Sequence, residues 1–203
     1  MLLLKILAFI VVLGIIAAIF YVRLTAIRES KKTVQQFERL NEQLNLQLDT
    51  TRKVGNEVLP KLVGAFSGRN LLIEKTIRNR FKYLVVSIPF KNKHHLQLQI
   101  VPKGYATTPD RLEKAPVVEV NTEAAEKYLL IANKASLAKA FFEERFYPFW
   151  QKHQQIEFMF STLIAYNDQL TLALLAGGKK VKNDLVLEVT ITWLYQLAAA
   201  LEK

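Results

Sequence analysis

Three histidines are the residues of this chain best suited to hold a metal ion or transfer a proton. His94 and His95 are adjacent, and His153 lies far from them in the sequence. Neighbouring residues of an extended strand point to opposite faces, so His94 and His95 are not expected to grip one ion together. The chain also has no cysteine, which excludes a zinc-thiolate site. We therefore expect no metal site and no cofactor, with His94 and His95 at a solvated turn.

Other reactive groups give no stronger signal for catalysis. Glu143 and Glu144 are neighbours on an expected helix, where adjacent side chains diverge, so they make a poor carboxylate pair. The sequence contains no G-x-S-x-G nucleophile motif. Residues 177–180 read Gly-Gly-Lys-Lys but lack the spacing and the hydroxyl residue of a phosphate-binding loop. We expect no catalytic residue, and an enzyme without local motifs remains an alternative.

Positive charge is concentrated in one part of the chain. The 28 basic and 18 acidic residues give a net charge of +10, which favours an anionic partner. Residues 61–103 hold nine basic residues and one acidic residue. In this block Arg78, Arg80 and Lys82 alternate with uncharged residues, so one extended strand would place all three on the same face. Lys91 and Lys93 extend the basic character to the following turn.

The N-terminal segment is long and apolar enough to cross a bilayer. Leu2 to Val22 is apolar except for Lys5, and its 21 positions correspond to about 31 Å of helix. A cleaved signal peptide is the competing interpretation, because Lys5 resembles a charged leader and Ala17-Ala18 are small. The apolar run exceeds a normal leader, however, and no turn-forming cleavage site closes it. We expect a transmembrane helix over residues 1–22.

Basic residues beside this span predict its orientation. Lys5 precedes most of it, whereas Arg23, Arg28, Lys31, Lys32 and Arg39 follow it within twenty residues. Lysine and arginine accumulate on the cytoplasmic side of a membrane helix. The prediction is a single-pass protein of the inner (plasma) membrane with a cytoplasmic C-terminal domain.

This location bears on the partner of the basic block. Close to an anionic leaflet each lysine or arginine adds about 1 kcal/mol of attraction. Nucleic acid is a second polyanion, and Phe81 and Tyr83 are aromatic residues able to stack on bases. No recognised nucleic-acid-binding pattern accompanies them. Anionic-surface binding by Arg78, Arg80, Lys82, Lys91 and Lys93 is therefore assigned to lipid headgroups, against the alternatives of a solvated surface and of a nucleic-acid-binding domain.

Residues 23–60 are polar and favour a helix, which predicts a stalk. Five of its residues fit a heptad seam with one interior asparagine: Val34, Phe37, Asn41, Leu44 and Leu48. This spacing is typical of a coiled coil that makes a homo-oligomer, with Asn41 setting the register. Leucines off the seam widen the apolar stripe, as in a single amphipathic helix that packs on its own domain. Both interpretations stay open, and Pro60 is expected to end the stalk.

Beyond the stalk the pattern changes to short strands. Gly64, Ser67 and Gly68 indicate a flexible joint over residues 61–80. Strands are expected over residues 80–89 and 96–101 as one hairpin, over 117–120 and 127–132, and over 156–166 and 169–176 as a second hairpin around Asn167-Asp168. Helices are expected over residues 136–153, interrupted near Pro148, and over 185–203, where β-branched residues also allow a strand in the first half.

The expected fold class is α+β: a transmembrane helix (1–22), a helical stalk or coiled coil (23–60), a linker (61–80), and a globular domain (81–203). The domain combines a mostly antiparallel sheet with two helices, one of them C-terminal, because hairpins rather than alternating strands and helices follow one another.

Five segments carry a resemblance to a protein group. They are Lys127-Tyr128-Leu129-Leu130, Ala138 to Phe142, Ile156-Glu157-Phe158, Asp168-Gln169-Leu170 and Leu197 to Leu201. Their order resembles the strand, helix, hairpin and closing-helix pattern of uncharacterised bacterial single-pass membrane-anchored proteins. The resemblance implies no catalytic residues. We expect a membrane-anchored, non-enzymatic protein whose globular domain mediates protein interaction or self-assembly at the membrane surface, with a partner that the sequence does not name.

Overall fold

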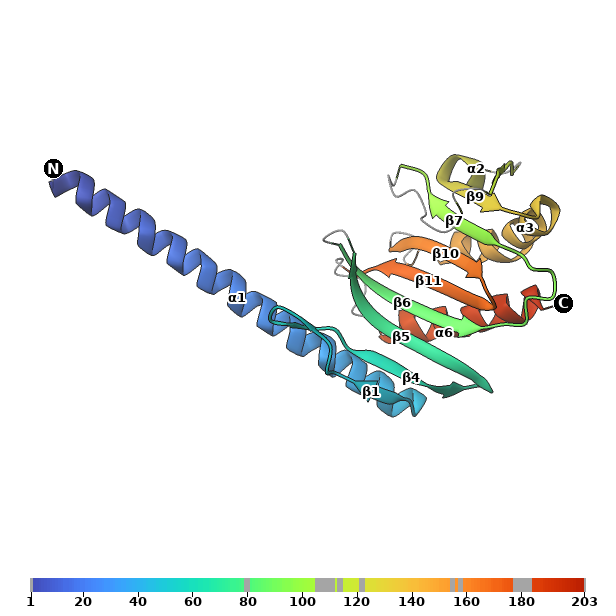
Figure 1. Cartoon of the computed structure of the whole chain (residues 1–203), viewed down its shortest axis with the longest axis horizontal. Helices are drawn as coiled ribbons and strands as arrows, with labels where there is room; N and C mark the ends of the chain where they lie inside the picture. Colours follow the sequence, from blue (N-terminus) through green and yellow to red (C-terminus); the bar gives the residue numbers. More distant parts are fainter. Residues whose placement is uncertain are drawn as a thin grey trace.

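The structure, a computed structural model, describes residues 2–78, 81–104, 112, 115–120, 123–153, 156, 159–176 and 184–202, with side chains from residue 9 onward except 184–186. A long N-terminal helix leads into an antiparallel sheet that is closed by a C-terminal helix (Figure 1). This confirms the α+β class with an N-terminal apolar helix. Arg80, Glu157, Phe158 and the Gly177–Lys180 segment lie outside the described residues.

Helix α1 (Leu2–Leu44) is a single unbroken helix. It contains no proline, and the span and the stalk expected from the sequence are two halves of it. The helix ends sooner than the expected Pro60, because Asn45 adopts a left-handed conformation with φ 50°, a common helix terminator. The rest of the expected stalk forms short strands: β1 (Gln47–Asp49), β2 (Lys53–Val54) and β3 (Glu57–Val58).

The expected linker over residues 61–80 is wrong, because this segment forms a hairpin of β4 (Lys61–Phe66) and β5 (Arg69–Arg78). Ser67 and Gly68 have φ values of 48° and 77° and make its tight turn, for which such residues are favoured. Gly64 allows close packing, since a Cβ atom there would lie 2.9 Å from Cδ2 of Leu46. Residues that suggested flexibility therefore build a turn and a close contact.

The main sheet has nine strands in the order β1-β4-β5-β6-β11-β10-β7-β9-β8, all paired antiparallel. The expected β10–β11 hairpin is confirmed, with Asn167 and Asp168 at positive φ in its turn. The other expected hairpin is wrong: β11 and β10 lie between β6 and β7. The remaining strands are β6 (Phe81–Pro89), β7 (Leu98–Pro102), β8 (Val117–Val118), β9 (Tyr128–Ala132), β10 (Phe160–Tyr166) and β11 (Gln169–Leu175).

The expected central helix is divided into short pieces. A π-helical turn precedes the final piece, and Pro148 lies in that piece's first turn, where its missing N–H is tolerated. The C-terminal helix is helical throughout, although its first half is rich in β-branched residues. The pieces are α2 (Ala124–Lys127), α3 (Ala135–Phe141), η1 (Phe142–Phe146), α4 (Tyr147–Lys152) and α6 (Asp184–Leu201).

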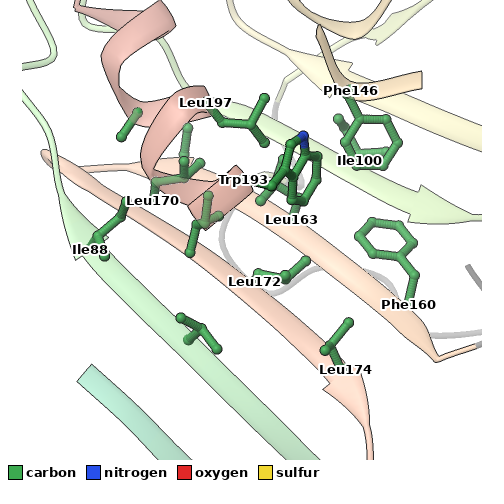
Figure 2. Packing of buried hydrophobic residues seen from close by; sticks show 14 of the residues in the cluster. Ile88, Ile100, Phe146, Phe160, Leu163, Leu170, Leu172, Leu174, Trp193 and Leu197 are labelled. Carbon is green, nitrogen blue, oxygen red and sulfur yellow. The ribbon is translucent and has the colours of Figure 1, made fainter. Parts of the chain in front are cut away.

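The core lies between one face of the sheet and these helices. Trp193 of α6 and Phe146 of η1 are buried, with ring centroids 5.9 Å apart. Figure 2 shows both rings over Phe160, Leu163 and Ile100 of the central strands. Alternate residues of the neighbouring strands continue this apolar layer, and they are all in the same buried cluster: Leu62, Ile73, Val86, Ile88, Leu170, Leu172 and Leu174.

Candidate membrane-facing site

The two halves of α1 have different surroundings. From Phe9 to Val22 its large apolar side chains are exposed, and the most apolar stretch has no buried residue, so α1 is long and apolar enough to cross a membrane. Figure 1 shows this half projecting away from the domain. In the second half, Phe37 and Leu40 are 2% and 1% exposed and belong to the core cluster. The helix therefore joins its exposed apolar first half rigidly to the globular domain.

The packing of the second half of α1 distinguishes between the two interpretations of the stalk. Phe37, one of the apolar residues of the expected pairing seam, is buried against its own domain. Leu44 and Leu48 pack partly against the same core, while Val34 and Asn41 are half-buried. The structure thus shows the single amphipathic stalk that packs on its own domain.

Hydrogen bonds join α1 to β3 and β5 at the end of its packed half that is nearer the N-terminus. Nζ of Lys75 lies 2.7 Å from Oε1 of Glu57 and donates a hydrogen bond to Thr33 of α1 at 3.2 Å. Nζ of Lys82 lies 2.7 Å from Oε2 of Glu57. The backbone N–H of Val58 donates to the hydroxyl of Ser30 at 2.9 Å. We call Ser30, Thr33, Glu57, Lys75 and Lys82 the anchor junction.

Glu57 is the charge that holds the anchor junction together. Its side chain is 11% exposed, and that of Lys75 is 8% exposed. Burial opposes ionisation of Glu57, but the contacts with Lys75 and Lys82 outweigh this effect, so the pKa of the carboxyl lies below its ordinary value. Glu57 is therefore a carboxylate at neutral pH, shared between two ammonium groups.

Two hairpins end beside the anchor junction. The β2–β3 hairpin carries Lys53 and Val54, and the β5–β6 hairpin carries Arg78 and Phe81. All four are exposed, and the apolar pair is 51% exposed at Val54 and 57% at Phe81. Figure 1 shows these hairpin ends on the side of the domain toward the projecting half of α1. We call Lys53, Val54, Arg78 and Phe81 the rim.

The structure divides the basic residues that the sequence grouped together. Arg78 ends β5 and pairs with Phe81, whereas Lys82 pairs with Ile77, so Arg78 and Lys82 do not share a face of one strand as expected. Lys91 and Lys93 follow the opposite end of β6, about 30 Å away along the strand. Arg80, the fifth predicted residue, lies outside the described residues.

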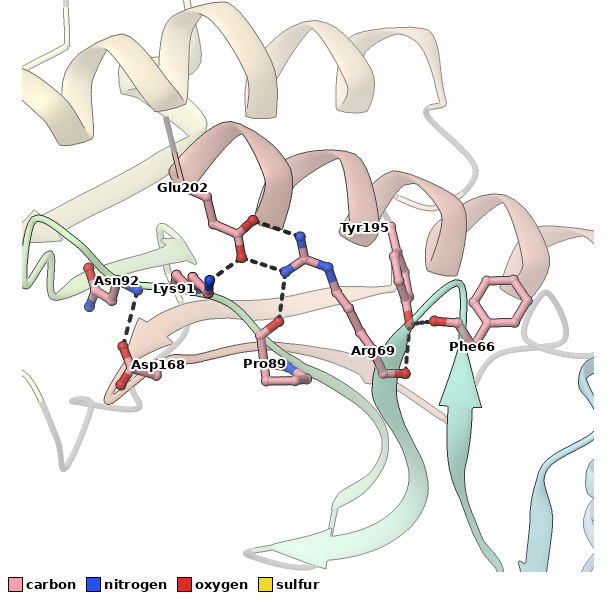
Figure 3. A network of polar contacts seen from close by, with 8 residues as sticks. All are labelled: Phe66, Arg69, Pro89, Lys91, Asn92, Asp168, Tyr195 and Glu202. Carbon is pink, nitrogen blue, oxygen red and sulfur yellow. Dashed lines mark hydrogen bonds and ion pairs between the residues drawn. The ribbon is translucent and has the colours of Figure 1, made fainter.

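A second polar cluster lies at that opposite end, beside Lys91. Both guanidinium nitrogens of Arg69 contact the carboxylate of Glu202, at 2.6 and 2.8 Å (Figure 3). The backbone N–H of Lys91 also donates to Glu202, at 2.8 Å. The hydrogen bond from Arg69 is the main reason that the pKa of Glu202 falls to about 2, and the Lys91 N–H adds to it. With Tyr195 donating to the carbonyl of Phe66, this clamp fastens the C-terminal helix to the β4–β5 turn.

The clamp borders a hollow of about 790 Å³ that is lined by both signs of charge. Its acid Glu202 is engaged by Arg69, and Asp168 accepts a hydrogen bond from the N–H of Asn92. Lys91 and Lys93 line it as exposed side chains. Within the described part of the chain, no group of three or more His, Asp or Glu residues is placed to hold a metal ion. The two acids of the hollow thus make structural contacts, while its two lysines extend into solvent.

The anchor junction and the exposure of Phe81 leave little trace in the sequence. Glu57, Lys75 and Lys82 come from three strands, and their meeting depends on the β4–β5 hairpin that had been interpreted as a linker. The one available signal was the alternation of Leu71, Ile73 and Lys75, which puts a lysine in line with core residues.

Comparison with known proteins supports the fold. No protein-family model matches this chain, and no curated protein matches it. Among solved structures, the crystal structure of the mycobacterial trehalose monomycolate transport factor A, TtfA, is similar with a TM-score of 0.58. The match covers 81% of this chain and 92% of that chain at 10% sequence identity. At this identity the likeness shows a shared fold: this chain has the α+β architecture of a mycobacterial transport factor.

Proposed function

We propose that this protein is a membrane-anchored, non-enzymatic protein whose globular domain binds a protein partner at the membrane surface. The observation that carries the proposal is the unbroken helix α1, exposed and apolar in its first half and built into the core of the domain in its second. A domain joined in this way stays at the bilayer in a restricted orientation. Its working surface is then presented to other components of the membrane.

The same helix favours a permanent anchor over a cleaved leader. Cleavage near Ala17-Ala18 would cut α1 in mid-helix, upstream of the residues that pack into the core. Basic residues after the span support a cytoplasmic domain at the inner membrane. Of the predicted lipid-binding residues, we assign Arg78 and Arg80 to the anionic leaflet, since Lys82 is paired with Glu57 and Lys91 and Lys93 follow the far end of β6.

The shared fold supports an accessory role. TtfA is by name a trehalose monomycolate transport factor, and from it we extend to this chain only a non-catalytic role. Self-assembly through the stalk is the weaker form of the proposal, because Phe37 is already buried within its own chain. Val34 and Asn41 are half-buried, so part of each side chain stays accessible for such pairing.

Proximity labelling in cells tests the proposal. The full chain carries a labelling enzyme after Lys203, and two controls carry it after residue 30 or on a chain that lacks residues 1–22. We expect at least one membrane protein to be enriched by the full chain over both controls. If the full chain enriches no protein over the control that ends at residue 30, the domain does not bind a partner. If the chain that lacks residues 1–22 enriches the same protein equally, the anchor is not needed for that binding.

A reporter that is active only outside the cytoplasm, fused at the same site, tests the orientation. We expect it to be inactive in the full chain, and activity would place the domain on the other side of the membrane.

A further inference from the structure

Two exposed apolar side chains lie where this domain approaches the bilayer. Val54 and Phe81 are at the ends of separate hairpins, and both are more than half exposed although each is next to well-packed strands. We propose that the rim enters the lipid headgroup layer through Val54 and Phe81, which gives the domain a second contact with the membrane besides α1. This inference rests on the membrane anchoring in the proposed function.

The position of the rim follows from contacts along α1. Lys75 contacts Thr33, and Lys82, two residues nearer the hairpin end, contacts Glu29 at 3.9 Å. Two strand residues span about 6.6 Å, and the four helix residues between the two contacts span about 6 Å. The β5–β6 hairpin therefore runs alongside α1 toward the N-terminus.

Extending this register places Phe81 close to the bilayer. Phe81 and its partner Arg78 lie one strand residue beyond Lys82, which corresponds to α1 near Ile27. Five helix residues, about 7.5 Å, separate that level from Val22, where the apolar run ends. The headgroup layer on each side of the hydrocarbon is about 5–7 Å thick. The level of Phe81 is therefore close to the outer edge of that layer.

The β2–β3 hairpin reaches the same level independently. The N–H of Val58 contacts Ser30, and Val54 pairs with Glu57, one residue nearer the end of the hairpin. Figure 1 shows this hairpin extending along α1 toward the N-terminus. The two hairpins thus place one apolar residue each at about the same level along α1.

The residue types of the rim suit a bilayer surface. Phe81 pairs with Arg78 across the hairpin, and Lys53 precedes Val54 in β2, so each hairpin combines an apolar residue with a basic residue. Apolar side chains that enter the interface beside lysine and arginine are typical of membrane-surface segments. A bilayer is the expected partner of the rim, because the apolar run of α1 ends close to the level of the rim.

Depth-dependent quenching of a fluorophore tests the inference in the full chain. The protein has no cysteine, so a single introduced cysteine gives one labelled site. Asn56→Cys labels the exposed end of the β2–β3 hairpin and keeps Val54 and Phe81 in place. The labelled protein is reconstituted in vesicles of phosphatidylcholine and phosphatidylglycerol that carry a nitroxide on the headgroup.

The matched control is Val117→Cys on β8, an exposed position at the opposite edge of the sheet from the strands that contact α1. We expect headgroup quenching at residue 56 to exceed that at residue 117 by at least about twofold, because the headgroup layer is thin. Adding Val54→Ser and Phe81→Ser is expected to lower the quenching at residue 56. An unchanged value in that variant would overturn the role of the two apolar side chains.

A third label separates this inference from the proposed function. Ile15→Cys lies in the middle of the apolar half of α1, and a nitroxide deep in the acyl chains should quench it. Quenching at residue 15 with equal values at residues 56 and 117 overturns the second contact and leaves the anchor intact. An unquenched label at residue 15 overturns the anchor, and the second contact with it.

Discussion

Neutralising Glu57 is expected to destabilise the domain more than a single surface charge would. The Glu57→Gln variant leaves two ammonium groups without a carboxylate, one of them on Lys75, which is 8% exposed. Breaking a buried ion pair costs about 3–5 kcal/mol. Because Lys82 is 33% exposed and keeps part of its hydration, we expect the free energy of unfolding to fall by about 2–3 kcal/mol.

Urea denaturation of the full chain in detergent measures this loss. The two tryptophans, Trp150 and Trp193, are both buried in the core and report unfolding by their fluorescence. With a slope of about 2–3 kcal/mol per molar urea, the midpoint should move down by about 1 M. Replacing Glu57 and Lys75 together by leucine and methionine should recover part of the stability, because an apolar pair needs no charge compensation.

The pH dependence gives a second check. The pKa of Glu57 is lowered by folding, so its contribution is complete above the ordinary value of 4.5 and is lost as the pH falls below it. The difference between Glu57→Gln and the parent protein should therefore shrink in acid.

Glu74→Gln is the matched control, since Glu74 pairs with the 56% exposed Arg52 at 3.6 Å and its replacement should lower the free energy of unfolding by less than about 1 kcal/mol. Equal losses for Glu57→Gln and Glu74→Gln would refute the reasoning.

Three further outcomes follow from the packing and the clamp. Glu202→Gln should lower the free energy of unfolding by about 1–2 kcal/mol at pH 7. In the parent this contribution is present above pH 4.5 and lost as the pH falls toward the lowered pKa of about 2, which acid titration of stability would show. Phe37→Ala should lower the free energy of unfolding by about 3–4 kcal/mol at any protein concentration. Leu24→Ala, at a position that is 52% exposed, should lower it by less than about 0.5 kcal/mol. If Phe37→Ala changes the oligomeric state instead, the result would favour the coiled coil. Gly64→Val should cost about 1–3 kcal/mol through its clash with Leu46, and an unchanged urea midpoint would contradict that close packing.

Local sequence patterns predicted the elements that form between residues close together in the chain. The apolar run of α1 and the Asn167-Asp168 turn depend on neighbouring residues, and both expectations match the structure. The Ser67-Gly68 turn depends on neighbours too, but glycine and serine mark a flexible joint and a tight turn alike. Only the apolar alternation on both sides of it, through Leu62 and Leu71, distinguishes a hairpin.

Contacts between distant segments account for what the sequence did not show. The insertion of β10 and β11 between β6 and β7 depends on pairing between segments that lie far apart in the sequence, which no short window reveals. Lys82 appeared free because its partner Glu57 precedes it by 25 residues. A basic block therefore overstates the charge available to a ligand whenever its acids come from another part of the chain.

The anchor junction and the rim act on the same property, the orientation of the domain to the bilayer. A helix that crosses the membrane can tilt and rotate, and a domain on a flexible linker would not follow it. Here α1 continues without a break to Leu44, and hydrogen bonds at Ser30 and Thr33 join it to β3 and β5 while Phe37 and Leu40 pack into the core, so a rotation of the span must turn the whole sheet. Contact of the rim with headgroups limits that rotation at a second point. Binding of a partner to either the span or the domain would then change the position of the other.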